Sequence, residues 1–503
     1  MPDPRYDELV RRLKEASLLE SVNELLNWDL ESYMPPKGAC LRADQLGLVA
    51  ALAHQKATDP RVGELLSGLE GSELVKDPGS CEAVVIREAR RDYDKRTRLP
   101  ASLVAELAKT AALARQDWAQ ARKDSDFSKF LPSLERVVAL ARQKAAAYGT
   151  FAEPYDALLD DYEPGTTSAE LTQVFSSLRV ELSDLLARVG ASSHKPDPSV
   201  LEGDYAVGLQ KVFAESVASA MGFDFRAGRL DVTIHPFCTG IGPGDTRILT
   251  RYNPRRLNEG LFGVMHEAGH ALYEMGLDKE RWFGTPMGMP ASVGLHESQS
   301  RMWENLVGRS KSFWRYFFPQ AQRLFRSALG DVSLDAFHAA INEAKPSHIR
   351  IEADEVSYNL HILLRFELER ALLSGDLEPA DIPMEWNARF KKYLGLEVRR
   401  DSEGCLQDIH WAAALFGYFP TYTLGNLYAA QLFEKARQDL PGLDAAFTNG
   451  SFAQLRDWLH SNVHRHGRRY HAARLCERLT GRPLSHRPLM DYLTAKCAET
   501  YKL

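Results

Sequence analysis

The stretch LNEGLFGVMHEAGHALYEMG, residues 257–276, determines how this sequence is interpreted. Apolar residues flank its centre on both sides, which predicts a buried helix. The centre, HEAGH, places His266 and His270 four residues apart, so both side chains project from one face of that helix. Two imidazoles in this arrangement can bind one zinc ion. Glu267 lies about 100° around the helix, where its carboxylate faces a metal-bound water rather than the metal.

The alternative interpretation is a coincidental H-E-x-x-H sequence. Burying two histidines and a glutamate costs free energy unless they are paired or bind a metal, which favours the metal site. A catalytic zinc ion needs a third protein ligand. Glu297, in HESQ (296–299), is the leading candidate, because a Gly- and Pro-rich loop (284–294) before it could turn the chain back. His296 and Glu274 remain alternative ligands.

The composition excludes several classes of protein. The 503 residues contain 62 Lys and Arg against 68 Asp and Glu, a formal net charge of −6, so we expect no nucleic-acid partner. No apolar run approaches the roughly 18 residues that span a bilayer, and the charged N-terminus lacks an apolar signal segment. The six cysteines form no C-x-x-C pair, which is typical of reduced thiols. We expect a soluble, cytoplasmic protein that does not associate with membranes.

The hydrophobic pattern predicts a mainly α fold, a large helical body with a small β-sheet beside the HEAGH helix. Helical periodicity dominates the first 180 residues, for example over 100–123 and in the helix that ends at Gly149. Short β-like runs lie within 224–252, separated by the turn sequence GIGPGD. We expect one catalytic domain over 1–503, with an N-terminal helical part over about 1–190 and a catalytic part over about 200–503.

An ordered set of short motifs accompanies the HEAGH helix. Its members are LNWDLESYMPP (26–36) with Arg42, His235-Pro236-Phe237, Asp245-Thr246-Arg247, HESQ (296–299), IRIEAD (349–354), GCLQDIHW (404–411) and GYFPTYTLGN (417–426). Together they cover most of the chain, and the set resembles the carboxypeptidase Taq family of zinc-dependent metallocarboxypeptidases. One departure is visible, because the D-x-R-x-T element has Leu249 at its last position, with Thr250 directly after it.

The resemblance implies a zinc or cobalt ion bound by His266, His270 and Glu297, with Glu267 as general base and proton shuttle. It also implies an almost all-helical body with a deep cleft, a small sheet along one wall, and a homodimer. The implied activity is the stepwise release of single C-terminal amino acids from peptide substrates, with broad specificity and poor action on C-terminal proline.

Further donors must meet the developing oxyanion in such a reaction. By similarity to helical zinc peptidases, His410 and a tyrosine of GYFPTY are the candidates, with Tyr422 first and Tyr418 second. The alternative for these aromatic residues is helix packing.

A carboxypeptidase must also bind a free carboxylate, which arginine captures well. Arg350 and Arg247 are the candidates, with Gln407 as a neutral partner. Structural ion pairs, Arg350 with Asp354 and Arg247 with Asp245, are the alternative.

Two rival functions remain. A helical zinc oligopeptidase or dipeptidase, with endo or dipeptidyl cleavage, would share the same helix and distant glutamate. A non-catalytic scaffold with a structural metal has no use for Glu267, because structural sites are usually closed by four ligands. A second histidine cluster (His460, His464, His466, His471) sits among arginines and is expected to be a solvated helix end.

Overall fold

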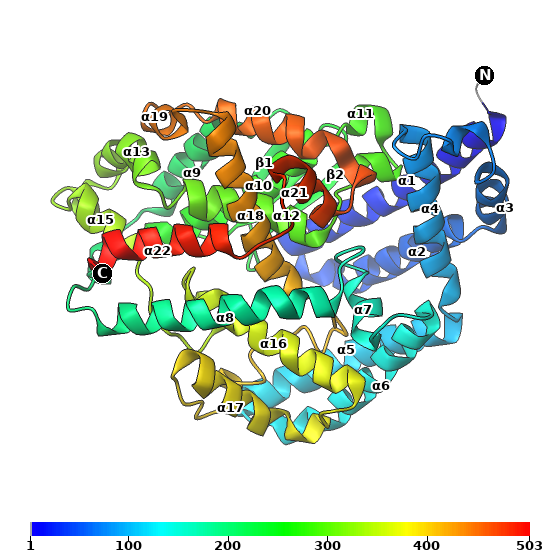
Figure 1. Cartoon of the computed structure of the whole chain (residues 1–503), viewed down its shortest axis with the longest axis horizontal. Coiled ribbons are helices and arrows are strands. Elements are labelled where there is room, and N and C mark those ends of the chain that lie inside the picture. Colours follow the sequence, from blue (N-terminus) through cyan, green and yellow to red (C-terminus); the bar gives the residue numbers. More distant parts are fainter. Residues whose placement is uncertain (1–2) are drawn as a thin grey trace. The chain divides into compact units, whose positions relative to one another are not determined.

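The computed structural model describes residues 3–503 and confirms a mainly helical chain with one small sheet (Figure 1). The chain divides into two compact units, each made of three segments. The first contains Met1–Thr97, Asp197–Ile341 and Leu432–Gly481, and the second contains Arg98–Pro196, Asn342–Gln431 and Arg482–Leu503. Each unit draws on both of the parts expected from the sequence, and a single catalytic domain over 1–503 stays a prediction.

The first unit holds the sheet and most of the helices. Its elements are α1 (Pro4–Ser32), α2 (Ala39–Ala57), α3 (Pro60–Leu69), α4 (Cys81–Arg98), α9 (Val207–Met221), β1 (Gly228–Val232), β2 (Phe237–Gly242), β3 (Asp245–Thr250), α10 (Leu257–Gly276), α11 (Lys279–Trp282), α12 (Val293–Arg301), α13 (Lys311–Leu324), α14 (Arg326–Leu329), α15 (Leu334–Ile341), α19 (Leu443–Thr448), α20 (Ala453–Asn462) and α21 (Ala472–Thr480).

The sheet has the strand order β1–β3–β2, with β1 parallel and β2 antiparallel to β3. The predicted turn is present, because Gly244 between β2 and β3 adopts a left-handed φ of 73° that favours glycine. Ile248 and Leu249 of β3 are fully buried, and β2 and β3 both pack against α10. The small sheet therefore lies beside the HEAGH helix, as predicted. Ile234 lies beyond the end of β1 and is exposed.

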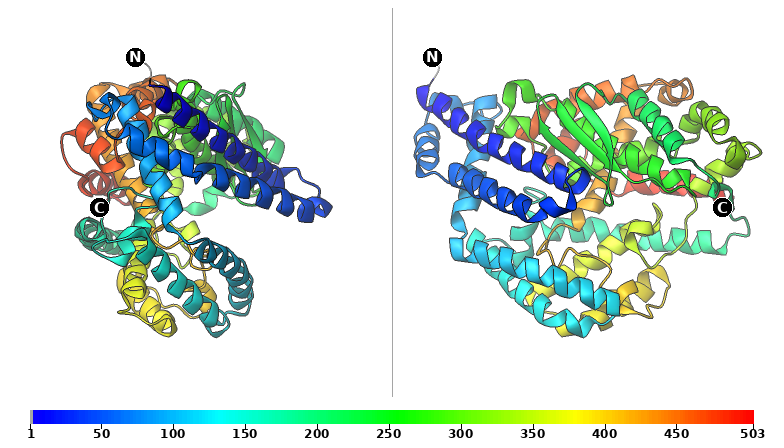
Figure 2. Two further views of the ribbon diagram at one scale, coloured as in Figure 1. Left: turned by 90° about the vertical axis from the view of Figure 1, so that its right-hand side faces the viewer. Right: turned by 180° about the vertical axis from the view of Figure 1, so that it is seen from behind.

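Helices α1 and α2 form the pair expected near the N-terminus, drawn in blue in Figure 2. Arg42 of α2 forms an ion pair with Asp29 of α1 at 2.8 Å and donates to the carbonyl of Leu26. The Tyr33 hydroxyl, at the end of α1, donates to Asp231 of β1 at 2.6 Å. The Arg42 contacts thus join the two helices, and the Tyr33 contact joins α1 to the sheet.

The second unit is helical. It contains α5 (Ala101–Asp124), α6 (Leu131–Tyr148), α7 (Pro154–Leu159), α8 (Ser168–Ala191), α16 (Ser357–Ser374), α17 (Ile382–Leu394) and α22 (Arg487–Tyr501), and α18 (Pro420–Asp439) begins in this unit and ends in the first. Thr167 and Glu170 form a capping box at the start of α8. Gly149 ends α6, as predicted. Among residues 3–503, no helix has the length and hydropathy of a membrane span.

Candidate active site

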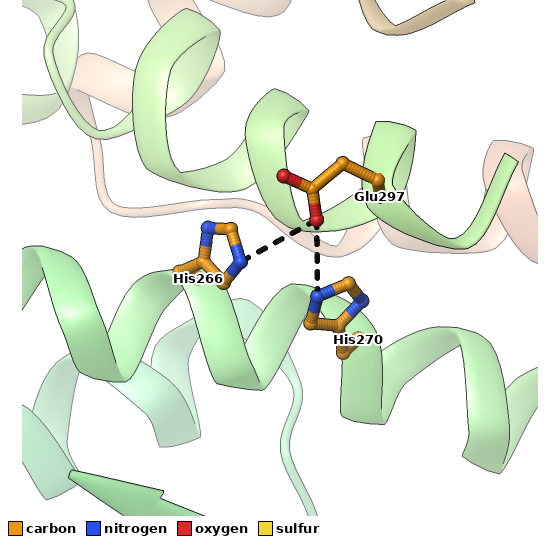
Figure 3. A group of neighbouring side chains, drawn as sticks. All are labelled: His266, His270 and Glu297. Carbon is orange, nitrogen blue, oxygen red and sulfur yellow. Dashed lines mark ion pairs between the residues drawn. The ribbon is translucent and has the colours of Figure 1, made fainter. Parts of the chain in front are cut away.

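Helix α10 presents His266 and His270 on one face, and Glu297 of α12 faces both (Figure 3). The Nε2 atoms of His266 and His270 lie 3.6 Å and 3.4 Å from Oε2 of Glu297. One ligand atom from each residue lies within 4.8 Å of the other two. Two imidazole nitrogens and one carboxylate oxygen are a donor set that a catalytic zinc ion uses, with a fourth position left open. These three residues therefore fit a divalent metal ion.

The close approach of α12 to α10 depends on a glycine of the HEAGH sequence. A Cβ at Gly269 would stand 2.6 Å from the carbonyl oxygen of Gln299 and 2.6 Å from Cα of Ser300, both in α12. Only glycine fits such a contact without a backbone shift. The Ser292 side chain caps α12 by accepting from the backbone N–H of Leu295, which fixes where that helix begins. This packing places Glu297 over the two histidines.

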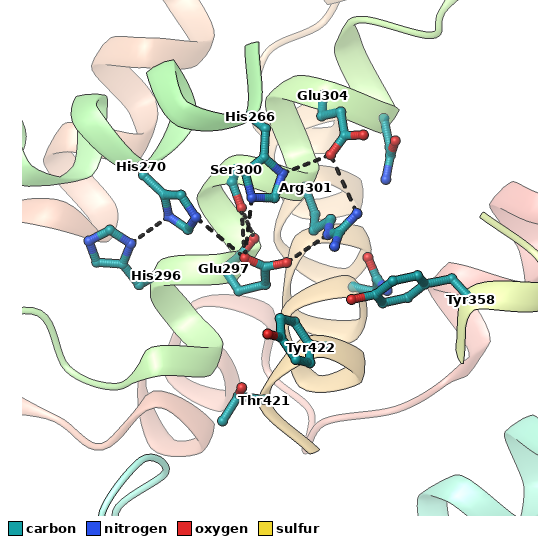
Figure 4. Close-up of polar contacts among 12 residues, drawn as sticks. His266, His270, His296, Glu297, Ser300, Arg301, Glu304, Tyr358, Thr421 and Tyr422 are labelled. Atoms are coloured by element: carbon teal, nitrogen blue, oxygen red, sulfur yellow. Dashed lines mark hydrogen bonds and ion pairs between the residues drawn. The ribbon is translucent and has the colours of Figure 1, made fainter. Parts of the chain in front are cut away.

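A carboxylate and an arginine support His266 and Glu297 from behind (Figure 4). Nδ1 of His266 lies 2.8 Å from Oε2 of Glu304, which lies on the π-helical turn that follows α12. Nε of Arg301 donates to Oε1 of Glu297 at 2.7 Å, and its Nη1 donates to Glu304 at 3.4 Å. Oε1 of Glu297 is thus occupied by Arg301, while Oε2 faces the histidines.

The two alternative ligands form a hydrogen-bonded chain behind His270. Nδ1 of His296 lies 2.5 Å from Nδ1 of His270, and Nε2 of His296 lies 2.8 Å from Oε1 of Glu274. The other oxygen of Glu274 accepts from Lys279. His296 thus contacts the far side of His270, and Glu274 contacts His296, whereas Glu297 contacts the side of His270 that carries Nε2.

The two imidazoles have opposite electrostatic surroundings. Burial opposes the charged form of His266, but the carboxylates of Glu297 and Glu304 outweigh it and raise its pKa to about 9. Burial and the neighbouring His296 lower the pKa of His270 to about 4. Arg301 and both histidines overcome burial and hold the pKa of Glu297 well below its usual range. Glu297 is therefore a carboxylate at neutral pH.

Glu267 has the surroundings of a general base. Its side chain is buried, and burial together with the nearby carboxylates of Glu297 and Glu304 raises its pKa to about 7. Among the described residues, no hydrogen bond or ion pair engages its carboxylate. A carboxylate with this pKa can take up and release a proton near neutral pH.

The predicted carboxylate-binding residue Arg350 belongs to a buried ion cluster in the second unit. Its Nε and Nη2 donate to Oδ1 of Asp408 at 3.0 Å and 2.7 Å, and its Nη1 donates to the hydroxyl of Tyr358. The fully buried Arg365 pairs with the other oxygen of Asp408. The alternative pair with Asp354 is not formed, because Asp354 instead accepts backbone N–H groups at the start of α16.

His410 and Tyr422, the predicted oxyanion donors, contact each other. Nε2 of His410 lies 3.1 Å from the hydroxyl of Tyr422. Burial and the guanidinium groups of Arg350 and Arg365 lower the pKa of His410 to about 4, so its imidazole is neutral at pH 7. Tyr418, the second candidate, packs edge-on against the ring of Tyr422.

The other two predicted substrate-binding residues make structural contacts. The Gln407 amide accepts from the backbone N–H of Arg350 and donates to three backbone carbonyls, so its polar atoms are in use. Arg247 forms the predicted alternative pair with Asp245, at 2.9 Å and 2.8 Å, and its guanidinium lies 4.1 Å from the ring centroid of Trp28. The hydroxyl of Thr250 contacts the carbonyl of Gly260 in α10.

The comparisons with known proteins agree with this geometry. Residues 8–497 match the family model described as Carboxypeptidase Taq (M32) metallopeptidase. The chain belongs to the carboxypeptidase Taq family. Thermostable carboxypeptidase 1 of Thermus thermophilus is 48% identical over 99% of both chains, and carboxypeptidase 1 of Bacillus subtilis is 38% identical over 100% of this chain and 99% of its own. A crystal structure of the carboxypeptidase of this family from Deinococcus radiodurans matches with a TM-score of 0.96 at 39% identity, covering 100% of both chains.

Membership of the carboxypeptidase Taq family makes this protein a metallocarboxypeptidase, a hydrolase that acts on peptides. Sequence reasoning did not single out Glu304 and Arg301, which contact His266 and Glu297. Metal-binding histidines usually donate their second N–H to a carboxylate. Glu304, seven residues after Glu297, was therefore a possible partner for a histidine ligand.

The second histidine cluster of this Taq-family carboxypeptidase was partly misjudged. His464, expected at a solvated helix end, is buried, and its Nε2 lies 2.9 Å from Oε1 of Gln299 in the HESQ motif. Burial and His460 lower the pKa of His464 to about 3. His464 follows α20 closely, at the start of the short helical turn His464–Arg469, and the sequence pattern carries no signal for its burial. His460 and His471 are exposed.

Proposed function

We propose that this metallocarboxypeptidase releases single C-terminal amino acids from peptides, with a zinc ion held by His266, His270 and Glu297. The observation that carries the proposal is the convergence of these three donors beside the buried, unpaired carboxylate of Glu267. A zinc ion, when bound, acts as a Lewis acid that polarises a carbonyl and acidifies water. Cobalt, which accepts the same donors, is the second metal we propose.

Glu267 supplies the base in this proposal. Its carboxylate takes the proton of the attacking water and then passes it to the nitrogen of the departing amino acid. A pKa of about 7 suits both transfers, because the group can be found in either protonation state at neutral pH. A scaffold that only held a metal would have no use for an ionisable group placed there.

The ion cluster around Asp408 supports a role in recognising the substrate carboxylate. Two buried guanidinium groups, those of Arg350 and Arg365, share a single carboxylate, which leaves one positive charge without a counter-ion in the cluster. A free peptide carboxylate has the charge and the planar shape that arginine binds best. We therefore keep Arg350 as the primary recognition residue, whereas the saturated contacts of Gln407 and Arg247 favour supporting roles.

His410 and Tyr422 are kept as the donors to the oxyanion. A neutral imidazole bonded to a phenol hydroxyl can donate a hydrogen bond to a developing negative charge without carrying a charge of its own. Broad specificity and poor action on C-terminal proline complete the proposal. The bond before such a proline is a tertiary amide with no N–H and a fixed φ, which distinguishes it from every other substrate bond.

The test is mass spectrometry of an unblocked ten-residue peptide over time, with metal-loaded and chelated protein. We expect a ladder that loses one residue at a time from the C-terminus, and no ladder after chelation. Internal cuts or the release of dipeptides would replace the proposal with the oligopeptidase or dipeptidase reaction. An intact peptide with metal-replete protein would contradict it.

We also propose a homodimer that covers an apolar face of the α1–α2 pair. Apolar side chains recur at helical spacing on both helices and are exposed, namely Leu18, Val22, Leu25, Leu41, Leu48 and Leu52. Light scattering should give twice the mass of one chain, and Leu48→Lys should reduce it to that of a monomer. A monomeric wild type contradicts the dimer.

We also propose a cytoplasmic location. Cell fractionation tests this location, and secretion would contradict it.

A further inference from the structure

The chain of residues behind His270 differs from the support of His266. The second ring nitrogen of His266 contacts a carboxylate directly, which is the usual support for a metal-binding histidine. The second ring nitrogen of His270 instead contacts another histidine, His296. The other ring nitrogen of His296 contacts the carboxylate of Glu274.

If His270 binds a metal, the hydrogen bonds that link His270, His296 and Glu274 can run in only one donor-to-acceptor direction. Its Nε2 must then be free of a proton, so its Nδ1 carries the proton and donates to Nδ1 of His296. The Nε2 of His296 therefore carries a proton and donates to Oε1 of Glu274, whose other oxygen accepts from Lys279. Every polar atom along the chain then has a partner, and His296 is held as one tautomer.

Helix α10, helix α12 and strand β2 enclose these hydrogen-bonded residues. The side chains of His296, Glu274 and Lys279 are 19%, 12% and 11% exposed. The carboxylate of Glu274 and the ammonium group of Lys279 lie directly against Gly240 of β2, where a Cβ would displace both groups. Burying an imidazole and an ion pair side by side is costly unless each group is satisfied, so their arrangement restricts the ring of His270 to one orientation.

We propose that His296 is a positioning residue, which with Glu274 and Lys279 fixes the tautomer and the ring orientation of His270. The inference rests on the proposed role of His270 as a metal ligand. His296 then contributes to metal affinity without touching the metal or the substrate. Loss of such a partner weakens metal binding by roughly 10- to 100-fold.

Glu274 and Lys279, at the end of this hydrogen-bonded series, are open to solvent. Glu274 and Lys279 line a cavity of about 740 Å³, together with Trp282 and Arg281. A small anion can therefore reach the position of the Glu274 carboxylate without crossing the metal site. This opening allows the missing group to be supplied from solution in a variant.

The first experiment compares His296→Leu, which removes both hydrogen bonds, with His296→Gln, which keeps an acceptor and a donor. His471→Leu, at an exposed histidine of the same unit, is the matched control. Chelator competition should show a Kd for zinc that rises 10- to 100-fold in His296→Leu, rises less in His296→Gln, and is unchanged in the control. Circular dichroism establishes that each variant is folded.

The second readout is proton NMR of the cobalt-loaded protein, in which ring N–H protons of bound histidines give strongly shifted signals. The wild type should show two exchangeable signals, one for His266 and one for His270. His296→Leu should lose one of them to rapid solvent exchange. A role limited to packing would leave both signals in place.

The third experiment adds formate to Glu274→Ala, with neutral formamide as the control. Formate should restore a large part of the zinc affinity, formamide should restore none, and neither should change the wild type. Equal effects of both compounds, or none from formate, would contradict a role for the carboxylate at that position.

The outcomes separate this inference from the proposed function. If His270→Ala binds zinc as tightly as the wild type, the metal-ligand assignment fails and the inference fails with it. If His270→Ala loses zinc but His296→Leu keeps both the wild-type Kd and the two NMR signals, only the positioning role is overturned.

Discussion

Gly269 of α10 lies directly against the backbone of Ser300 in α12, so close that a Cβ on the glycine would stand 2.6 Å from Cα of the serine. The contact joins the two helices that carry the side chains proposed to bind the metal. Gly269, directly before the second histidine of the HEAGH sequence, thus determines how closely Glu297 approaches the two histidines.

Replacing Gly269 with Ala should therefore move α12 away from α10 and weaken zinc binding at least 10-fold, as measured by chelator competition. The matched control is Gly47→Ala in α2, where a Cβ meets no atom within 4 Å. That control should keep the wild-type Kd and stabilise the chain by up to about 1 kcal/mol, because alanine favours helix. Equal Kd values in both variants would contradict the packing argument.

Replacing Glu267 with Gln should remove the base and keep the metal site. We expect kcat to fall roughly 10²- to 10⁴-fold while the zinc content stays at that of the wild type. Glu259→Gln, at an exposed glutamate of the same helix, should have full activity. Steady-state kinetics and metal analysis check both variants, and a Glu267→Gln variant with more than a tenth of wild-type kcat would exclude this residue as the base.

Metal binding should stabilise the folded chain, because the donors come from two helices that separate on unfolding. Zinc at 100 times its Kd raises the free energy of unfolding by about 2.7 kcal/mol if it binds only the folded state. Thermal unfolding with zinc and with chelator measures this difference. Glu297→Gln should abolish most of it, and a full shift in that variant would show that the zinc ion binds elsewhere.

Replacing Arg350 with Gln should impair recognition of the free C-terminus. The wild type should hydrolyse a peptide with a free carboxylate far faster than its C-terminal amide, because the excess positive charge of the cluster binds a carboxylate. In the variant, kcat/KM for the free acid should fall at least 100-fold and the preference over the amide should shrink. An unchanged preference would assign Arg350 to structure alone.

The raised pKa of Glu369, in the second unit, predicts a pH-dependent contribution to the free energy of unfolding. Burial raises its pKa to about 7, although Tyr155, Trp411 and the N–H of Gly417 donate to it. An unfolded glutamate titrates near 4.3, so between about pH 4.3 and 7 the folded chain holds a proton that the unfolded chain has lost. This contribution is fully present below pH 4.3 and is lost as the pH rises through 7, by up to about 4 kcal/mol.

Denaturant unfolding of the wild type and Glu369→Gln at pH 5 and pH 8 tests this linkage. The free energy of unfolding of the wild type should fall more between these pH values than that of the variant. The same pH dependence in both proteins would mean that Glu369 is ionised in the folded state.

The sequence predicted much of the fold and the centre of the candidate site, because those features are local. Helical periodicity, the turn at Gly244 and the spacing of His266 and His270 each depend on a few neighbouring residues. The pairing of Glu297 with these histidines was only a leading hypothesis, since it depends on a tertiary contact at Gly269 that no periodicity reveals.

The remaining site residues depend on long-range contacts. His464 was expected at the surface because its neighbours are arginines, yet in the structure it lies against Gln299, 165 residues earlier in the chain. The alternative predicted for Arg350, an ion pair with Asp354 four residues away, is replaced in the structure by a pair with Asp408. Spacing along one helix could not identify either contact, because each joins segments that meet only in the folded chain.

The central claim is that His266, His270 and Glu297 bind one zinc ion, and anomalous diffraction at the zinc edge from a zinc-soaked crystal tests it most directly. The account predicts a single strong peak per chain, roughly 2.0–2.2 Å from Nε2 of both histidines and from Oε2 of Glu297. A peak bound instead by His296 and Glu274, or no peak on α10, would contradict it.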